Sequence, residues 1–180
     1  MCVNVLEAIG KRHSYRGKYT DIPVSREDLK TIMKAGLAAP SGCNMQTVSL
    51  IGVDDPLIMK QLLQVIDPPV AETAPAAVCV LTQRIPAYRD KCFAVQDYSA
   101  TIQNMLLAAV ELGYQSCWYE GHITDDDQIN ARMAKILHVP EQYELVCFLP
   151  IGVGEGEPCA PVKKPFQQRA WFNVFPEEYQ

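Results

Sequence analysis

The sequence predicts a single α+β domain, in which amphipathic helices accompany buried strands. A chain of 180 residues is long enough for one domain that buries about 70% of its unfolded surface. Helices are indicated where apolar residues recur every three to four positions. Strands are indicated by short, continuously apolar runs, of which 76–82 and 143–153 are the clearest. No internal repeat or low-complexity linker divides the chain.

Composition excludes several classes of function. Hydrophobic residues make up 48% of the chain and charged residues 21%, which is typical of a globular protein and not of a disordered one. The net charge of −5 argues against a general nucleic-acid binder, because such proteins carry a basic surface. No apolar run approaches the roughly 20 residues that span a bilayer, and residues 1–4 do not begin a secretory signal. We therefore expect a cytoplasmic protein with neither nucleic acid nor membrane as a partner.

The cysteines are interpreted as core residues and not as metal ligands. No two have the C-x-x-C spacing and the three histidines lie far apart, so zinc and iron–sulfur signatures are missing and no metal site is expected. Several lie in apolar runs, where a reduced cysteine behaves as a small core residue. Cys43 lies in a predicted loop and is the candidate for reactivity, although a structural role is the commoner one. The seven are Cys2, Cys43, Cys79, Cys92, Cys117, Cys147 and Cys159.

Helices are predicted from this periodicity and from the signals at their ends. Ser25 and Asp55 have the side chains of N-cap residues, and a proline follows Asp55 in the first turn. Gly113 closes the fourth helix, which has the strongest apolar periodicity. Thr124 is the expected cap of the fifth, with the aspartates 125–127 complementing its positive end. The predicted helices are 2–11, 25–39, 55–66, about 97–112 and 124–137.

Strands are predicted between these helices. Segment 47–53 follows a small polar loop. Segment 114–119 is bounded by Gly113 before it and by Glu120-Gly121-His122 after it. The glycines after the last strand do not form a dinucleotide-binding fingerprint, because they do not open a helix. The predicted strands are 47–53, 76–82, 114–119 and 143–153.

A basic cluster, Arg12-His13-Ser14-Tyr15-Arg16, follows the first helix. Its two guanidiniums, imidazole and hydroxyl, with no carboxylate among them, could hold a phosphate, which arginine contacts bidentately. On these residues alone, a solvated helix end that matches the helix dipole is the commoner explanation. Because a helix C-terminus repels anions, a phosphate here would have to be held by the side chains or by another helix.

Two other segments have the composition of contact regions. Loop 41–46 is small and rich in hydrogen-bonding groups, and it is equally consistent with a ligand site or with an ordinary turn that has Asn44 in a left-handed conformation. Segment 157–180 is too aromatic for a disordered tail and too rich in proline for a helix or central strand. We expect it to pack as an extended arm on its own domain or on a partner.

Motifs of one family follow one another along most of the chain. They are Arg12-His13-Ser14-x-Arg16, Ala39-Pro40-Ser41-Gly42-x-Asn44-x-Gln46, the helix from Asp97 to Gly113, Trp118-Tyr119-Glu120-Gly121 and Lys163-Lys164-Pro165. In this order and spacing they resemble the nitroreductase family of flavoenzymes. The chain is similar to a small member, because it lacks the long insert that many members carry before the central helix.

The resemblance implies a fold and an assembly. The expected fold is an α+β sandwich with a central mixed sheet flanked by helices, in one domain over 1–180. Two chains would exchange their terminal arms to form a homodimer with two flavin sites at the interface. The aromatic segment 157–180 would then pack on the partner chain and supply much of the adhesion.

The resemblance also implies FMN as cofactor and names its contacts. Arg16 matches a residue at the pyrimidine end of the flavin, where a cation stabilises the reduced ring, and His13 lies within the same motif. Glu120 and Gly121 match a turn near the flavin N5 and O4. The positions that match the phosphate contacts are Arg12, Ser14 and either Lys163 or Lys164. The loop that a partner chain lays against the flavin is matched by Pro40, Ser41, Gly42, Asn44 and Gln46.

The implied reaction passes hydride from NADH or NADPH through the flavin to a nitroaromatic, a quinone or a similar small-molecule acceptor. The cofactor performs the chemistry, so no catalytic side chain is assigned; His122 could donate a proton, but a solvent-facing or capping histidine is commoner. One alternative is a specialised relative that performs reductive dehalogenation or flavin cleavage. Another is a flavin-binding sensor or carrier without turnover.

Overall fold

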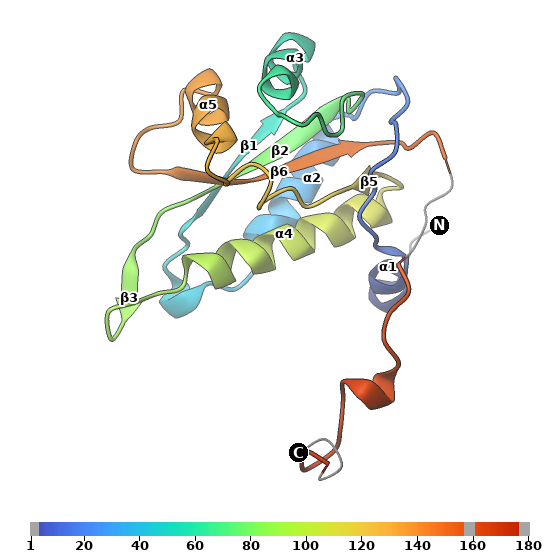
Figure 1. Ribbon diagram of the computed structural model, residues 1–180, viewed down its shortest axis with the longest axis vertical. Coiled ribbons are helices and arrows are strands. Elements are labelled where there is room, and N and C mark those ends of the chain that lie inside the picture. The colour runs from blue at the N-terminus through green and yellow to red at the C-terminus, as the bar shows by residue number, and fades with distance from the viewer. Residues whose placement is uncertain (1–3, 157–160, 177–180) are drawn as a thin grey trace.

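The computed structural model describes residues 4–156 and 161–176, and Figure 1 shows a sheet between helical layers with an arm beside it. The helices are α1 (Val5–Lys11), α2 (Arg26–Leu37), α3 (Pro56–Gln64), α4 (Ala94–Glu111) and α5 (Ile129–Ile136), with 3-10 turns η1 (Gly42–Asn44) and η2 (Phe166–Gln168). The strands are β1 (Val48–Val53), β2 (Ala76–Thr82), β3 (Pro86–Tyr88), β4 (Lys91–Cys92), β5 (Gln115–Ser116) and β6 (Glu144–Gly152). The α+β class is confirmed.

The central sheet has the order β1-β2-β6-β5, and each pair of neighbouring strands in it is antiparallel. Over the described residues it is therefore antiparallel and not mixed as we expected. The reason lies in the connection 54–75, which carries α3 and then returns to the end of the sheet that it left. Val53, the last residue of β1, is consequently paired with Ala77 at the start of β2.

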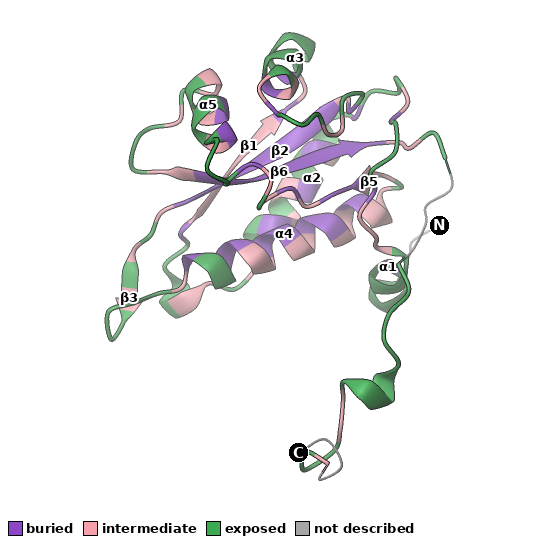
Figure 2. Cartoon of the chain, in the orientation of Figure 1, coloured by how far each residue is buried: buried purple, intermediate pink, exposed green. Residues whose placement is uncertain are grey.

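Helices cover both faces of this sheet, and the central strands are buried between them (Figures 1 and 2). In β2, Ala77, Cys79 and Leu81 pack in one core cluster with α3 and α5. Ala76, Val78 and Val80 point the other way, into the cluster built on α2 and α4. Each large apolar side chain buried in this way contributes about 1.5–3 kcal/mol. Because helices bury both faces of the central strands, successive residues of those strands are apolar.

Several helix ends lie where the sequence predicts them. The Ser25 hydroxyl accepts a hydrogen bond of 3.0 Å from the Asp28 amide at the start of α2. Asp55 accepts from the amides of Leu57 and Ile58 at 2.8 and 3.1 Å. Gly113 follows α4 with a φ of 83°, a conformation that glycine adopts without a Cβ penalty.

The prediction that Thr124 caps the fifth helix is wrong. Helix α5 begins at Ile129, after Gln128 with a φ of 53°. The Thr124 hydroxyl instead donates to the carbonyl oxygen of Glu120 at 3.0 Å, as does its amide. These bonds close a turn over 120–124. The Thr124 side chain therefore stabilises this turn and does not cap α5, which starts five residues later.

The predicted strand 114–119 is shorter than expected, and one hairpin was not expected. Only Gln115–Ser116 form a regular strand, although Tyr119 makes an isolated bridge with Phe148. Segment 86–92 forms the two-stranded hairpin of β3 and β4. In the part of the chain that the structure describes, no helix is long and apolar enough to cross a membrane.

The apolar face predicted for the first helix is exposed in the single chain. Val5, Leu6 and Ile9 of α1 are 70%, 79% and 50% exposed, while Cys2 lies outside the described residues. Residues 161–176 extend away from the domain (Figure 1). The aromatic rings of this arm contact one another, Phe166 with Phe172 and Trp171 with Phe175. Packing of the arm on a partner stays a prediction.

Candidate flavin-binding site

The basic cluster runs beside β5 after α1 ends. The amide of Tyr15 donates to the carbonyl oxygen of Ser116 at 2.9 Å. The buried Tyr15 side chain donates from its hydroxyl to the carbonyl oxygen of Lys18 at 2.6 Å. This buried tyrosine fixes the middle of the cluster, so the residues on either side of it are held against the 115–119 segment.

Arg12, Ser14 and Arg16 all act on the buried thiol of Cys117. Burial raises the pKa of the Cys117 thiol, and the charges of Arg16 and Arg12 and a hydrogen bond with Ser14 oppose that rise. Tyr119 also forms a side-chain hydrogen bond with this thiol. Two guanidiniums and a hydroxyl thus act on the same thiol, and these residue types form a donor set that suits phosphate.

Polar atoms without partners lie in the same region. The ring of His13 contacts the carbonyl oxygen of Lys11 through Nδ1 at 2.9 Å, while its Nε2 is buried without a hydrogen bond. A buried polar atom without a partner is unfavourable by about 1–3 kcal/mol. The Ser116 hydroxyl can donate to an anion, and His13 can donate from Nε2 in its imidazolium form, because Nδ1 already donates to the carbonyl oxygen of Lys11. The residues present therefore fit a phosphate-bearing group such as FMN. The unpartnered atoms among the described residues are His13 Nε2, Tyr19 Oη, Gln115 Oε1 and Ser116 Oγ.

A cleft of about 440 Å³ opens beside Arg16 and Tyr119, with segment 69–73 as its opposite wall. Thr73 Oγ1 accepts from the amide of Tyr19 at 2.7 Å. Nε2 of His122 lies 2.8 Å from the carbonyl oxygen of Pro68. His122 is thus used to hold the wall of the cleft, which favours its structural interpretation over proton donation.

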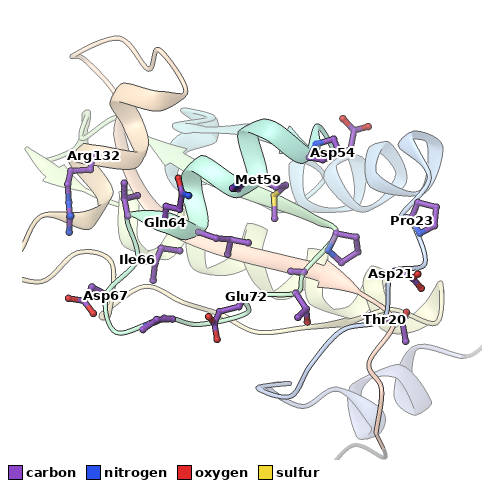
Figure 3. Close-up of a pocket in the computed structure, with 18 residues that line it drawn as sticks. Thr20, Asp21, Pro23, Asp54, Met59, Gln64, Ile66, Asp67, Glu72 and Arg132 are labelled. Carbon is purple, nitrogen blue, oxygen red and sulfur yellow. The ribbon is translucent and has the colours of Figure 1, made fainter.

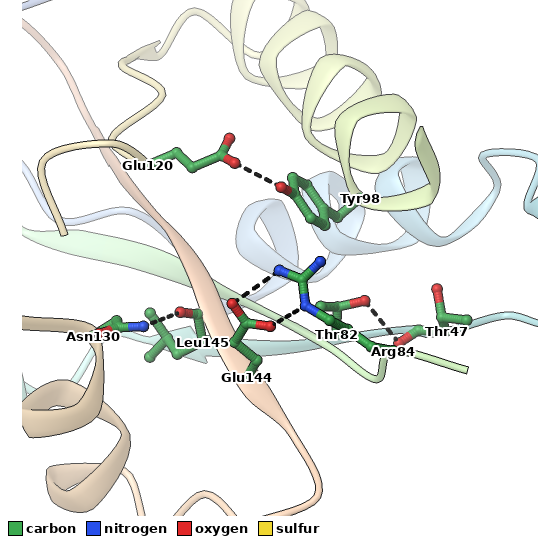
Figure 4. A network of polar contacts seen from close by, with 8 residues as sticks. All are labelled: Thr47, Thr82, Arg84, Tyr98, Glu120, Asn130, Glu144 and Leu145. Carbon is green, nitrogen blue, oxygen red and sulfur yellow. Dashed lines mark hydrogen bonds and ion pairs between the residues drawn. The ribbon is translucent and has the colours of Figure 1, made fainter. Parts of the chain in front are cut away.

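The carboxylate of Glu120 is held by two donors. Tyr98 of α4 donates from its hydroxyl to Oε1 at 2.6 Å, and Trp118 donates from its indole to Oε2 at 2.8 Å. Figure 4 shows the Tyr98 side chain pointing from α4 toward Glu120. Burial, and then the hydrogen bond to Glu120, raise the pKa of Tyr98 well above its usual value. Glu120 is therefore fixed, while Gly121 beside it is exposed.

Loop 41–46 folds as the turn η1 with strained backbone. Cys43, Asn44 and Gln46 have φ values of 52°, 56° and 51°, so the left-handed conformation of Asn44 is confirmed. The amide of Gly42 donates to Asp97 of α4 at 2.7 Å. A pocket of about 210 Å³ lies between the loop and α4, and Pro40, Ser41, Gln46, Asp97 and Thr101 are among its lining residues.

The predicted contacts do not all meet within one chain. Loop 41–46 is bonded to the first turn of α4, whereas the basic cluster is bonded to β5, which follows the end of that helix (Figure 1). The 18 residues of α4 rise roughly 27 Å at 1.5 Å per residue. Lys163 and Lys164 are exposed on the extended arm. The structure thus leaves the loop and the arm apart from the basic cluster, while the Glu120 turn follows Tyr119, which shares a cleft with Arg16, and is bonded to Tyr98 at the start of α4.

Comparison with known proteins identifies the fold. A family model described as the nitroreductase family matches residues 9–68 and 60–153. The chain belongs to the nitroreductase family. An NADPH-dependent oxidoreductase from Staphylococcus haemolyticus (strain JCSC1435) is 31% identical over 198 residues, which cover 95% of this chain and 74% of the relative.

Solved structures of other proteins have the same architecture as this chain. An FMN-dependent nitroreductase from Clostridium difficile R20291 is 27% identical with a TM-score of 0.78, over 94% of this chain and 99% of that one. A BluB-like flavoprotein from Clostridium difficile 630 has a TM-score of 0.80 at 24% identity, over 95% and 99% of the two chains. The nitroreductase fold that the motifs predicted is confirmed.

Two features of this nitroreductase-family chain escaped sequence reasoning. One is a cleft of about 930 Å³ between α3 and the segments around Asp21, Glu72 and Arg132 (Figure 3). Its walls come from distant segments, so no local pattern marks it. The other is Asp97, which is 3% exposed. A carboxylate beside the apolar stripe of the strongest helix was the signal that could have found it.

Proposed function

We propose that this chain is an FMN-dependent oxidoreductase that transfers hydride from NADH or NADPH to a small-molecule acceptor such as a nitroaromatic or a quinone. The observation that carries the proposal is the basic cluster bonded to Ser116, with His13 Nε2 and Ser116 Oγ buried without partners and with Arg12, Ser14 and Arg16 all acting on the Cys117 thiol. Family membership supports it, as do relatives named as an NADPH-dependent oxidoreductase and an FMN-dependent nitroreductase.

The chain's own residues bind and orient the cofactor in this proposal. Arg12 and Ser14 hold the phosphate, together with Lys163 or Lys164 of an arm. Arg16 places its charge at the edge of the cleft, where it stabilises a reduced flavin ring. When bound, FMN supplies both the hydride acceptor and the hydride donor.

The turn at Glu120 and Gly121 orients the ring edge. Tyr98 and Trp118 occupy both oxygens of the Glu120 carboxylate, so the turn presents backbone groups from a fixed position. Tyr119 and segment 69–73 form the walls of the cleft and limit access of water. No side chain of this site is assigned as a nucleophile or a base.

A homodimer completes the site in this proposal. Loop 41–46 lies apart from its own chain's basic cluster, so a second copy would have to supply Pro40, Ser41, Gly42, Asn44 and Gln46. The exposed apolar face of α1 and the exposed Val162, Phe166, Phe172, Val174 and Phe175 of the arm support such an interface, because large exposed apolar patches mark contact surfaces.

The test is an absorption spectrum of the purified protein with and without added FMN, followed by anaerobic addition of NADH or NADPH. We expect a flavin band that NAD(P)H bleaches and that an acceptor restores. A band that stays unbleached by either nucleotide would favour a sensor or carrier. If no FMN binds, the basic cluster is a solvated helix end and the proposal is wrong. Light scattering during size-exclusion chromatography measures the dimer separately.

A further inference from the structure

One buried carboxylate holds both ends of loop 41–46. Asp97 Oδ1 accepts from the amide of Gly42 at 2.7 Å, and its Oδ2 accepts from the hydroxyl of Thr47 at 2.8 Å. Asp97 and Thr47 are each 3% exposed. Since both carboxylate oxygens are used and shielded from water, the two ends of the loop are fixed relative to α4.

The loop between these two bonds has an unfavourable backbone. Cys43, Asn44 and Gln46 all adopt the left-handed region, which is disfavoured for residues that have a Cβ atom and persists only where the surroundings impose it. Gly42 is also packed closely, because a Cβ at its position would lie 2.6 Å from the side chain of Phe93. The fixed ends and this close contact hold the loop in a conformation that it would not adopt alone.

The same turn of α4 also holds the Glu120 turn. Asp97 is bonded to loop 41–46, and the next residue, Tyr98, is bonded to Glu120. Consecutive residues of one rigid helix therefore fix two segments that the proposed function assigns to flavin contacts.

We propose that Asp97 is a positioning residue, which presets loop 41–46 for the flavin bound in the other subunit. This inference rests on the proposed FMN site and homodimer. Asp97 acts through Gly42 and Thr47. Its effect is felt in the partner's site, whereas Tyr98 acts on the Glu120 turn of its own chain.

The test compares FMN affinity, measured by flavin fluorescence, between wild type and variants. We expect Asp97→Ala to weaken binding by about 10- to 100-fold, because the Gly42 amide and the Thr47 hydroxyl lose their acceptor. Asp97→Asn keeps an acceptor for Gly42 and is expected to restore most of the affinity. Thr47→Val removes one of the two hydrogen bonds, so it should weaken FMN binding less than Asp97→Ala does. If Asp97→Ala does not fold, Thr47→Val still tests the inference.

A matched control separates positioning from simple loss of stability. Asp55→Ala also removes a carboxylate that accepts two hydrogen bonds, but at the start of α3. We expect it to lower the melting temperature and to leave the FMN affinity unchanged. Equal affinities for wild type, Asp97→Ala and Thr47→Val would overturn the inference, whereas failure of wild type to bind FMN would overturn the proposed function itself.

A mixed dimer shows in which subunit Asp97 acts. One differently tagged chain carries Asp97→Ala and the other carries Arg12→Ala. If loop 41–46 serves the partner, both changes fall in one site and the other site is intact, so one FMN binds tightly per dimer. If Asp97 acts in its own chain's site, both sites are defective and no tight FMN binding remains, which would contradict the proposal.

Discussion

The hydroxyl of Tyr98 donates a hydrogen bond of 2.6 Å to Oε1 of Glu120. It joins the first turns of α4 to the turn that follows β5, with Trp118 bonded to the second carboxylate oxygen. A carboxylate with both oxygens bonded by partly buried donors cannot rotate without losing a hydrogen bond. The orientation of the Glu120 turn is therefore determined by a helix residue that lies 22 positions earlier in the chain.

Tyr98→Phe is expected to destabilise the fold by about 1–3 kcal/mol, because it leaves a carboxylate oxygen without its donor. It should also weaken FMN binding, since the Glu120 turn gains freedom. Denaturant unfolding and flavin fluorescence measure the two effects. Tyr88→Phe is the control, because the Tyr88 side chain is exposed and its hydroxyl can bond to water in place of protein groups. Equal losses in both variants would contradict a special role for Tyr98.

Stability should fall at alkaline pH through buried groups that stay protonated in the fold. Burial raises the pKa of Tyr19, Tyr98 and Tyr119, and it raises the pKa of Cys79 to about 12. Because the folded pKa values lie above the unfolded ones, these groups contribute fully below their unfolded pKa values of about 8.5 for cysteine and 10 for tyrosine. Their contribution is then lost progressively as pH rises from those values through the folded pKa values. Urea unfolding at pH 7.5 and pH 10.5 measures the difference.

Tyr19→Phe should reduce that alkaline loss and should leave stability at neutral pH equal to or above that of wild type. The Tyr19 hydroxyl is buried and has no hydrogen bond, so removing it takes away an unsatisfied group as well as a titrating one. A steeper fall of stability with pH in the variant than in wild type would contradict the assignment of part of the alkaline loss to Tyr19.

Arg12→Ala should weaken FMN binding by about 2–3 kcal/mol through loss of a charge-assisted contact with the phosphate. Fluorescence titration measures the change. Arg132→Ala is the matched control, because it removes the same charge from an exposed arginine at the larger cleft. Unchanged affinity in Arg12→Ala would exclude its phosphate role.

Leu6→Asp should disrupt the proposed homodimer while leaving the fold of the single chain intact. Leu6 is 79% exposed on α1, so a charge there is harmless unless a partner covers it. Leu57→Asp, at a side chain that is 72% exposed on α3, is the control and should remain dimeric. Light scattering reads the mass of each variant, and a dimeric Leu6→Asp would place the interface elsewhere.

A chain that ends before Pro158 should be a flavin-free monomer or insoluble, because it lacks both the aromatic arm and Lys163-Lys164. Chromatography and the flavin absorbance of the purified product test this. A soluble dimer with bound flavin would contradict the contribution of the arm.

Local patterns determined most of the secondary structure. The predicted strand 76–82 coincides with β2, because its apolar run is short and sharply bounded. The N-caps at Ser25 and Asp55 could be predicted because each capping hydrogen bond joins residues no more than three positions apart. At Thr124 the same rule failed, since a competing turn over 120–124 uses the hydroxyl. The order of short motifs was sufficient to identify the family.

The sequence by itself determined the family, the buried strands and the residue types that suit a phosphate. Only the tertiary structure decided which of them meet: the basic cluster is bonded to Ser116, beside Cys117, whereas loop 41–46 lies beside Asp97, more than fifty positions along the chain from Gly42. It also decided that the central sheet is antiparallel. Local patterns depend on neighbours within a turn or a strand, but contacts between distant segments depend on how the layers pack. The sequence was therefore sufficient to place Asp97 in a helix. Its hydrogen bonds to the two ends of loop 41–46 could be found only from the fold.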